Sequence, residues 1–167
     1  MSAQQCSCNR QRTAATEEPV LPQYGANEFK MKIAICSSMV FTEKMLEVRD
    51  KLENLGHEAF ISKFAEAYLG KTVKEIEELT LYHKNERDAI REFWKIINVS
   101  DAVLVLNYDR RGVSNYIGGN TLMEIGFAHV LNKKIFLMNP IPEIEYYKSE
   151  IEAVRPVVLN ENLEIIR

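Results

Sequence analysis

The chain has 167 residues, a length that suits one folded domain of ordinary size. Hydrophobic residues make up 46% of it and charged residues 27%, a balance that is typical of a soluble globular domain. The formal net charge of −3 leaves no basic footprint, so we expect no nucleic-acid polymer as a partner. No apolar run approaches the ~18–20 residues that span a bilayer, which argues against a membrane partner.

Residues 1–29 are rich in Gln, Ser, Thr, Ala and Pro and show neither helical nor strand periodicity. This composition predicts a disordered tail. The folded domain is therefore expected to span residues 31–167.

From residue 31 onward, short apolar runs alternate with amphipathic segments, and each type of segment has its own period. Strands are predicted at 32–36, 58–62, 102–106, 135–138 and 157–159, and helices at 42–55, 85–98, 121–131 and 143–154. Segment 71–81 is charged and only weakly helical, and the sequence assigns it no role. The alternation predicts an α/β fold, a Rossmann-like or flavodoxin-like three-layer sandwich with a five-stranded parallel sheet.

Parallel sheets of this kind bind ligands at the carboxyl ends of their strands, near the point where the strand order reverses. That rule selects two loops, 37–41 and 107–120. The second loop ends in Gly118-Gly119 directly before a predicted helix, where free backbone N–H groups can face a ligand. Neither the G-x-x-x-x-G-K-[ST] phosphate loop nor the G-x-G-x-x-G dinucleotide turn is present in the sequence.

The cysteines and histidines give no sign of a metal site. Cys6, Cys8 and Cys36 do not make a disulfide framework, which favours a cytoplasmic location. The three histidines lie far apart, and we expect neither a metal nor a cofactor. Cys36 follows the first strand, where low-molecular-weight phosphatases keep their nucleophile, but residues 37–43 contain no arginine to close a phosphate cradle. A small core residue is therefore the better interpretation of Cys36.

Three segments carry a resemblance to a known family: Ser-Asp-Ala-Val-Leu-Val at 100–105, Met-Glu-Ile-Gly-Phe-Ala at 123–128 and Asn-Lys-Lys-Ile at 132–135. This pattern resembles the nucleoside 2-deoxyribosyltransferase superfamily, which includes the deoxynucleoside-monophosphate N-glycosidases. The resemblance implies cleavage or transfer at the N-glycosidic bond of a (deoxy)nucleoside. It also implies a small-molecule nucleoside or nucleotide as partner and a homodimer or higher homo-oligomer. Apolar and aromatic contacts for such an assembly are expected at 141–147 and around Phe93 and Trp94.

The resemblance implies that Glu124 is the catalytic nucleophile, which attacks the anomeric carbon as in retaining glycosidases. A second interpretation stays open, because Thr121-Leu122-Met123-Glu124 also matches a capping box that closes a helix start. A non-catalytic nucleoside- or nucleotide-binding module on the same fold is the alternative function.

The substrate-binding residues are expected on the two loops. Ser37 and Ser38 are candidates for a sugar hydroxyl or for a helix cap, and Tyr116 is a candidate for stacking on a base. The full set of candidates is Ser37, Ser38, Asn107, Tyr108, Tyr116, Gly118, Gly119 and Asn120.

Departures from the family pattern bear on the substrate. Phe93 stands where the family carries a second aspartate, which favours the binding-module alternative. Val40 and Glu152 stand near positions where the monophosphate-specific branch has an arginine and a serine, which favours a neutral nucleoside. Arg110 and Arg111 remain as alternative contacts for a phosphate group.

Overall fold

The computed structural model describes residues 30–167, so the predicted tail at 1–29 lies outside the described residues. The strands are β1 (Lys32–Ser37), β2 (Glu58–Phe60), β3 (Ala102–Leu106), β4 (Lys134–Leu137) and β5 (Val157–Val158). The helices are α1 (Thr42–Asn54), α2 (Val73–Glu86), α3 (Ala89–Val99), α4 (Gly119–Val130) and α5 (Lys148–Ala153), with short 3-10 turns η1 (Met39–Phe41), η2 (Ala65–Tyr68) and η3 (Leu163–Ile165).

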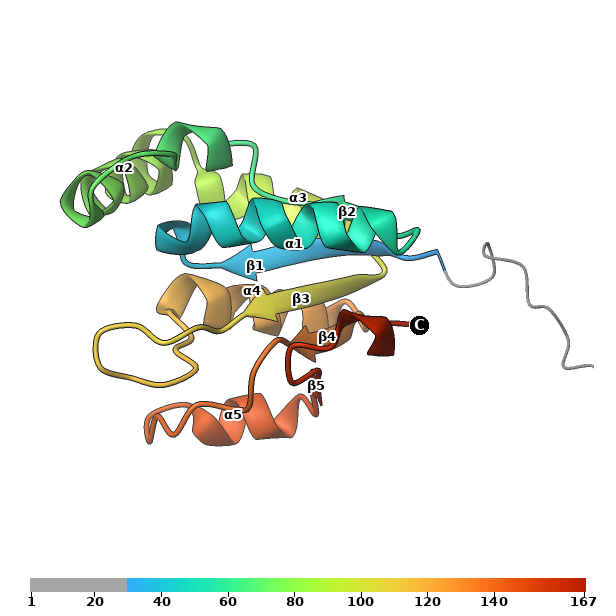
Figure 1. Cartoon of the computed structure of the whole chain (residues 1–167). Coiled ribbons are helices and arrows are strands. Elements are labelled where there is room, and N and C mark those ends of the chain that lie inside the picture. Colours follow the sequence, from blue (N-terminus) through green and yellow to red (C-terminus); the bar gives the residue numbers. More distant parts are fainter. Residues whose placement is uncertain (1–29) are drawn as a thin grey trace, which may run out of the picture.

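The five strands form one parallel sheet in the order β2-β1-β3-β4-β5. The sheet has helices on both faces, which confirms the predicted α/β sandwich (Figure 1). The chain first runs from β1 outward to β2 and then returns to β3 on the other side of β1. The strand order therefore reverses between β1 and β3, and their carboxyl ends are the place where this fold positions a ligand.

Successive side chains of β1 point to opposite faces of the sheet and so belong to two separate layers of the core. Ile33 and Ile35 face one side, where α1 and the C-terminal residues cover them. Ala34 and Cys36 face the other side, which α3, α4 and α5 cover. Every residue of β3 is buried, as expected for a strand between two helical layers. The interpretation of Cys36 as a core residue is confirmed, because its side chain is fully buried.

Helix α2 gives segment 71–81 a definite structure. Thr72 and Glu75 form the capping box at its start: the Thr72 hydroxyl accepts from the Glu75 N–H, and the Glu75 carboxylate accepts from the Thr72 N–H at 2.8 Å. Ile76 and His83 form the buried side of the helix. Figure 1 shows α2 and the loop before α4 beyond the edge toward which β1 and β3 point. Helix α2 therefore stands beside the ligand-binding edge of the sheet.

Three predicted helix boundaries differ from the structure. Helix α3 begins at Ala89 rather than at residue 85, because Asp88 adopts a left-handed φ of +46° and interrupts the helical path. Helix α4 begins two residues early, at Gly119, and α5 begins only at Lys148. Of the two aromatic residues proposed as subunit contacts on α3, Phe93 is a core residue, whereas Trp94 is partly exposed.

Candidate functional site

A cavity of about 360 Å³ opens at the carboxyl ends of β1 and β3. Three parts of the chain form its walls: the turn after β1, one side of α2, and the loop that leads into α4. The end of β1 and the turn after it supply Ser37, Ser38 and Met39. Helix α2 supplies Ile76, Glu77, Thr80, Leu81 and Lys84. The loop and the start of α4 supply Arg110, Arg111, Tyr116, Gly118, Gly119, Asn120 and Thr121. Six of the eight predicted substrate-binding residues therefore line one cavity: Ser37, Ser38, Tyr116, Gly118, Gly119 and Asn120.

Arg110 and Arg111 reach this cavity from a tight turn. The backbones of Arg110 and Val113 exchange two hydrogen bonds of 3.0 Å, and Arg111 and Gly112 between them have φ values of +54° and +73°. Positive φ at both central residues is the pattern of a type I′ turn, which Gly112 favours. Arg110 donates to Ser38 Oγ at 2.6 Å, and its guanidinium lies 5.9 Å from the centroid of the Tyr116 ring. The turn thus holds Arg110 against the wall of the cavity.

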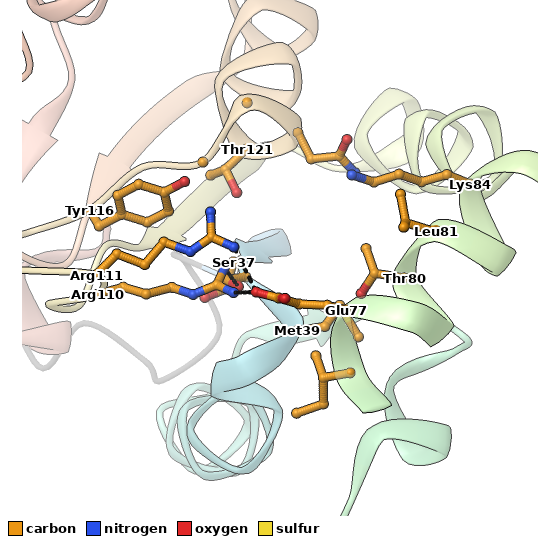
Figure 2. Close-up of a pocket in the computed structure, with 15 residues that line it drawn as sticks. Ser37, Met39, Glu77, Thr80, Leu81, Lys84, Arg110, Arg111, Tyr116 and Thr121 are labelled. Carbon is orange, nitrogen blue, oxygen red and sulfur yellow. Dashed lines mark hydrogen bonds and ion pairs between the residues drawn. The ribbon is translucent and has the colours of Figure 1, made fainter. Parts of the chain in front are cut away.

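Glu77 on α2 faces both arginines. Its Oε1 lies 2.6 Å from Arg111 Nη2 and 3.5 Å from Arg110 Nη2. Figure 2 shows the two arginine side chains extending side by side toward Glu77, with Lys84 farther along the same α2 wall. These ion pairs connect α2 to the loop across the cavity.

The start of α4 contributes backbone to the cavity. Gly118 is the N-cap residue of α4 and has no side chain to cap the free N–H groups of the first turn. A Cβ atom at Gly118 would lie 3.3 Å from the Tyr116 ring, so glycine allows this aromatic side chain to pack closely. Because α4 begins at Gly119, Thr121 is its third residue and Glu124 lies in its second turn. The capping-box interpretation of Thr121 and Glu124 is therefore wrong.

Glu124 has an unusual environment for a carboxyl group. Its Oε2 atom is buried and has no hydrogen-bond partner. Burial raises the pKa of Glu124 to about 8, while the nearby Cys36 thiol and the Lys84 ammonium favour the charged form. Burial, followed by the Glu124 charge, raises the pKa of Cys36 well above its usual value, so Cys36 stays a neutral thiol.

Glu124 is not itself part of the cavity lining, but it lies close behind it. Asn120 and Thr121, one helical turn earlier on α4, line the cavity. Lys84, whose charge acts on Glu124, lines it from the opposite wall on α2. A carboxyl group with one buried, unpaired oxygen thus lies one helical turn from the cavity lining.

Asn107 and Tyr108 lie away from this cavity, and we do not include them in the proposed site. The Asn107 amide donates to the carbonyl oxygens of Asn139 and Pro140 at 3.0 and 2.9 Å, and accepts from the Asn139 N–H at 2.9 Å. The Asn107 side chain therefore links the segments that follow β3 and β4 by hydrogen bonds. Tyr108 packs edge-on against Phe41, with their ring centroids 5.4 Å apart, on the α1 side of the sheet.

The sequence did not identify the α2 wall. Glu77, Thr80, Leu81 and Lys84 lie in a segment whose pattern indicates only a weak helix. Their position at the cavity depends on how α2 packs at the end of the sheet, and no local motif encodes that packing. The only sequence feature that could have indicated this wall is the charged side of α2, because a helix beside a ligand-binding edge of a sheet can direct charged residues toward the ligand.

Two further properties concern residues 30–167 alone. No three His, Cys, Asp or Glu side chains in this range gather closely enough to hold a metal ion. None of the helices in this range combines the length and the apolar character needed to cross a membrane.

Comparison with known proteins does not assign the chain to a family. No protein-family model matches it, and no curated protein matches it. One similar solved structure is a 2-deoxyribosyltransferase from the bacterium Bacillus psychrosaccharolyticus, 19% identical, covering 64% of this chain and 70% of that one with a TM-score of 0.43. Another is FerB, a flavoenzyme NAD(P)H:(acceptor) oxidoreductase from Paracoccus denitrificans, 15% identical, covering 77% of this chain and 74% of that one with a TM-score of 0.42. Similarities this low carry no argument about function, which must come from the site itself.

Proposed function

We propose that this protein cleaves or transfers at the N-glycosidic bond of a (deoxy)nucleoside or nucleotide, with Glu124 as the nucleophile. The observation that carries the proposal is the buried Glu124 Oε2 atom without a hydrogen-bond partner, one helical turn from residues that line a polar cavity. Leaving a buried polar atom unpaired costs about 1–3 kcal/mol, and structural polar groups are almost always paired. A carboxyl group that has an unpaired buried oxygen beside a ligand cavity suits a reactive role.

The proposed reaction has two steps. Glu124 first loses its proton to solvent, and its carboxylate then attacks C1′ of the sugar. The C1′–O bond forms as the C1′–N bond breaks, and the base leaves with the bonding electron pair and takes up a proton from solvent. Water or a second base then attacks C1′ and releases the carboxylate, which gives hydrolysis or transfer.

The cavity walls offer suitable partners for the rest of a nucleoside. The Ser37 hydroxyl, which donates to the Leu106 carbonyl at 3.0 Å and can still accept, and the Asn120 amide line the cavity and can bind sugar hydroxyl groups. The backbone of Gly119 allows close approach. The half-buried Tyr116 ring provides an aromatic surface for a base. A cavity of about 360 Å³ is within the usual range for sites that bind small molecules.

A non-catalytic nucleoside-binding module is the second candidate function, and one observation favours it. Phe93, at the position where the resembled family carries a second aspartate, is a core residue. Glu77 is the only carboxylate among the described residues that line the cavity, and it is paired with arginines. An acid that protonates the departing base is therefore not evident at the cavity wall.

The direct test is base release. The protein is incubated with deoxynucleosides and with deoxynucleoside 5′-monophosphates, with and without an acceptor base, and the products are separated by chromatography. The proposal predicts free base or an exchanged nucleoside. Tight binding without either product would establish the binding module instead.

The pKa of Glu124 predicts how the rate depends on pH. A nucleophile must be ionised, and the pKa of about 8 leaves the Glu124 carboxyl mostly protonated at neutral pH. We expect kcat/KM to rise about tenfold per pH unit below pH 8 and to level off above it. Rates measured from pH 5.5 to 9.5 check this profile. A profile that is flat across this range would contradict the assignment of Glu124.

A further inference from the structure

More basic than acidic side chains line the cavity. Arg110, Arg111 and Lys84 line it, and Glu77 is the only carboxylate on the described part of its wall. Glu124, behind the wall, is mostly uncharged at neutral pH. The cavity therefore carries a surplus of positive charge in a chain whose formal net charge is −3. Such a surplus, concentrated in a concave site, attracts an anionic ligand.

The two arginines are arranged as a receptor for oxygen atoms. Arg110 is fixed by Ser38 and lies against Tyr116, and its side chain is only 17% exposed. Arg111 is 60% exposed and converges with Arg110 on a single oxygen, Oε1 of Glu77. Planar guanidinium groups that converge on one point match the oxygen geometry of carboxylate and phosphate groups.

The start of α4 adds to the same site. The N-terminal residues Gly119, Asn120 and Thr121 line the cavity together with the arginines, and α4 has no side-chain cap. The free N–H groups and the positive end of a helix of 12 residues favour an anion at this place. The helix supports the argument, which depends mainly on the arginine pair.

We propose that Arg110 and Arg111 form the binding subsite for a phosphate group of the ligand, and that Glu77 occupies this subsite as an internal competitor. The Glu77 side chain is 46% exposed, so its pairing with the exposed Arg111 is weak and can be exchanged for water. A phosphate dianion brings more charge and three acceptor oxygens, and it displaces the Glu77 carboxylate from the arginines. Glu77 then swings into solvent from α2.

This subsite makes the ligand a nucleotide rather than a neutral nucleoside. That conclusion departs from the preference drawn from Val40 and Glu152, because the sequence did not show that Arg110 and Arg111 converge in one cavity with Ser38. The identification of the phosphate as part of a substrate rests on the proposed function. The existence of the subsite does not, since binding needs no chemistry at Glu124.

Isothermal titration calorimetry tests the subsite. Glu124→Gln protein is titrated with deoxynucleoside 5′-monophosphates, with the matching deoxynucleosides and with inorganic phosphate, so that no ligand is cleaved. We expect the monophosphates to bind at least tenfold more tightly than the nucleosides. Arg111→Gln in the same background should reduce that ratio to less than threefold, and Glu77→Gln should tighten monophosphate binding by about three- to tenfold. Inorganic phosphate should bind weakly and lose its binding with Arg111→Gln.

Arg49→Gln is the matched control, because Arg49 lies on α1, pairs with Asp50 and does not line the cavity. It should leave every affinity unchanged, and circular dichroism verifies that each variant is folded. Equal affinity for monophosphate and nucleoside, an unchanged ratio in Arg111→Gln, or no binding of any ligand at millimolar concentration would each overturn the subsite. Selective monophosphate binding by a protein that releases no base would retain the subsite and remove the glycosidic mechanism.

Discussion

Glu124→Gln is expected to lower the rate of base release by at least about three orders of magnitude, because it removes the proposed covalent nucleophile. A neutral amide oxygen attacks carbon far more weakly than a carboxylate does. The substitution keeps the size and shape of the side chain, so nucleotide binding should change little. Measured kcat should therefore fall while KM stays within a fewfold of its original value.

Glu78→Gln provides the matched control for this variant. Glu78 lies on the exposed side of α2, where it faces Lys74 at 4.0 Å, and it does not line the cavity. This control removes one carboxylate from the protein without touching the proposed site, and its turnover should equal that of the original chain. Base release by Glu124→Gln at a rate similar to that of Glu78→Gln would show that Glu124 is not the nucleophile.

Glu124→Gln is also expected to stabilise the fold at neutral pH, by about 3 kcal/mol at pH 7. The pKa of Glu124 is about 8 in the folded protein and 4.5 for an ordinary glutamate. Between these values the folded state holds a proton that the unfolded state releases. The contribution of this proton to stability is fully present below pH 4.5, falls as pH rises toward 8, and changes no further above pH 8.

Urea unfolding at several pH values measures this effect. Glutamine does not titrate in this pH range. The free energies of unfolding of the original protein and the Glu124→Gln variant should therefore agree near pH 4.5 and diverge steadily up to pH 8. If Glu124 had the same pKa in the folded and the unfolded protein, the two free energies of unfolding would instead differ by a constant amount at every pH. A constant difference across the range would therefore contradict the buried, protonated carboxyl described above.

The fold was largely predictable from the sequence because its strands are short and strongly apolar. Residues 102–106 are all apolar, and the corresponding β3 is buried along its whole length. The start of α4 was less predictable, because Gly118-Gly119 indicates a loop by propensity, yet the helix begins at the second glycine. That shift of two residues changes the interpretation of Glu124 from a helix cap to a carboxyl group with a buried, unpaired oxygen.

Only the site residues whose positions follow from the local sequence, at the ends of strands and helices, could be predicted. Ser37 ends β1, Ser38 follows it and Gly119 begins α4, so the rule for parallel sheets located them. Glu77 and Lys84 reach the cavity only because α2 packs at the end of the sheet, which is a tertiary effect. The polarity of Asn107 indicated a ligand contact, but the carbonyl groups of Asn139 and Pro140 use its amide.

The most direct test of the central claim is to trap the intermediate. The protein is mixed with deoxynucleoside 5′-monophosphate, quenched with acid during turnover, digested and analysed by mass spectrometry. The account predicts that the peptide containing Glu124 gains the mass of the deoxyribosyl phosphate group, and that the Glu124→Gln protein shows no such gain. Steady base release by the original protein with an unmodified Glu124 peptide, or with the added mass on another residue, would contradict it.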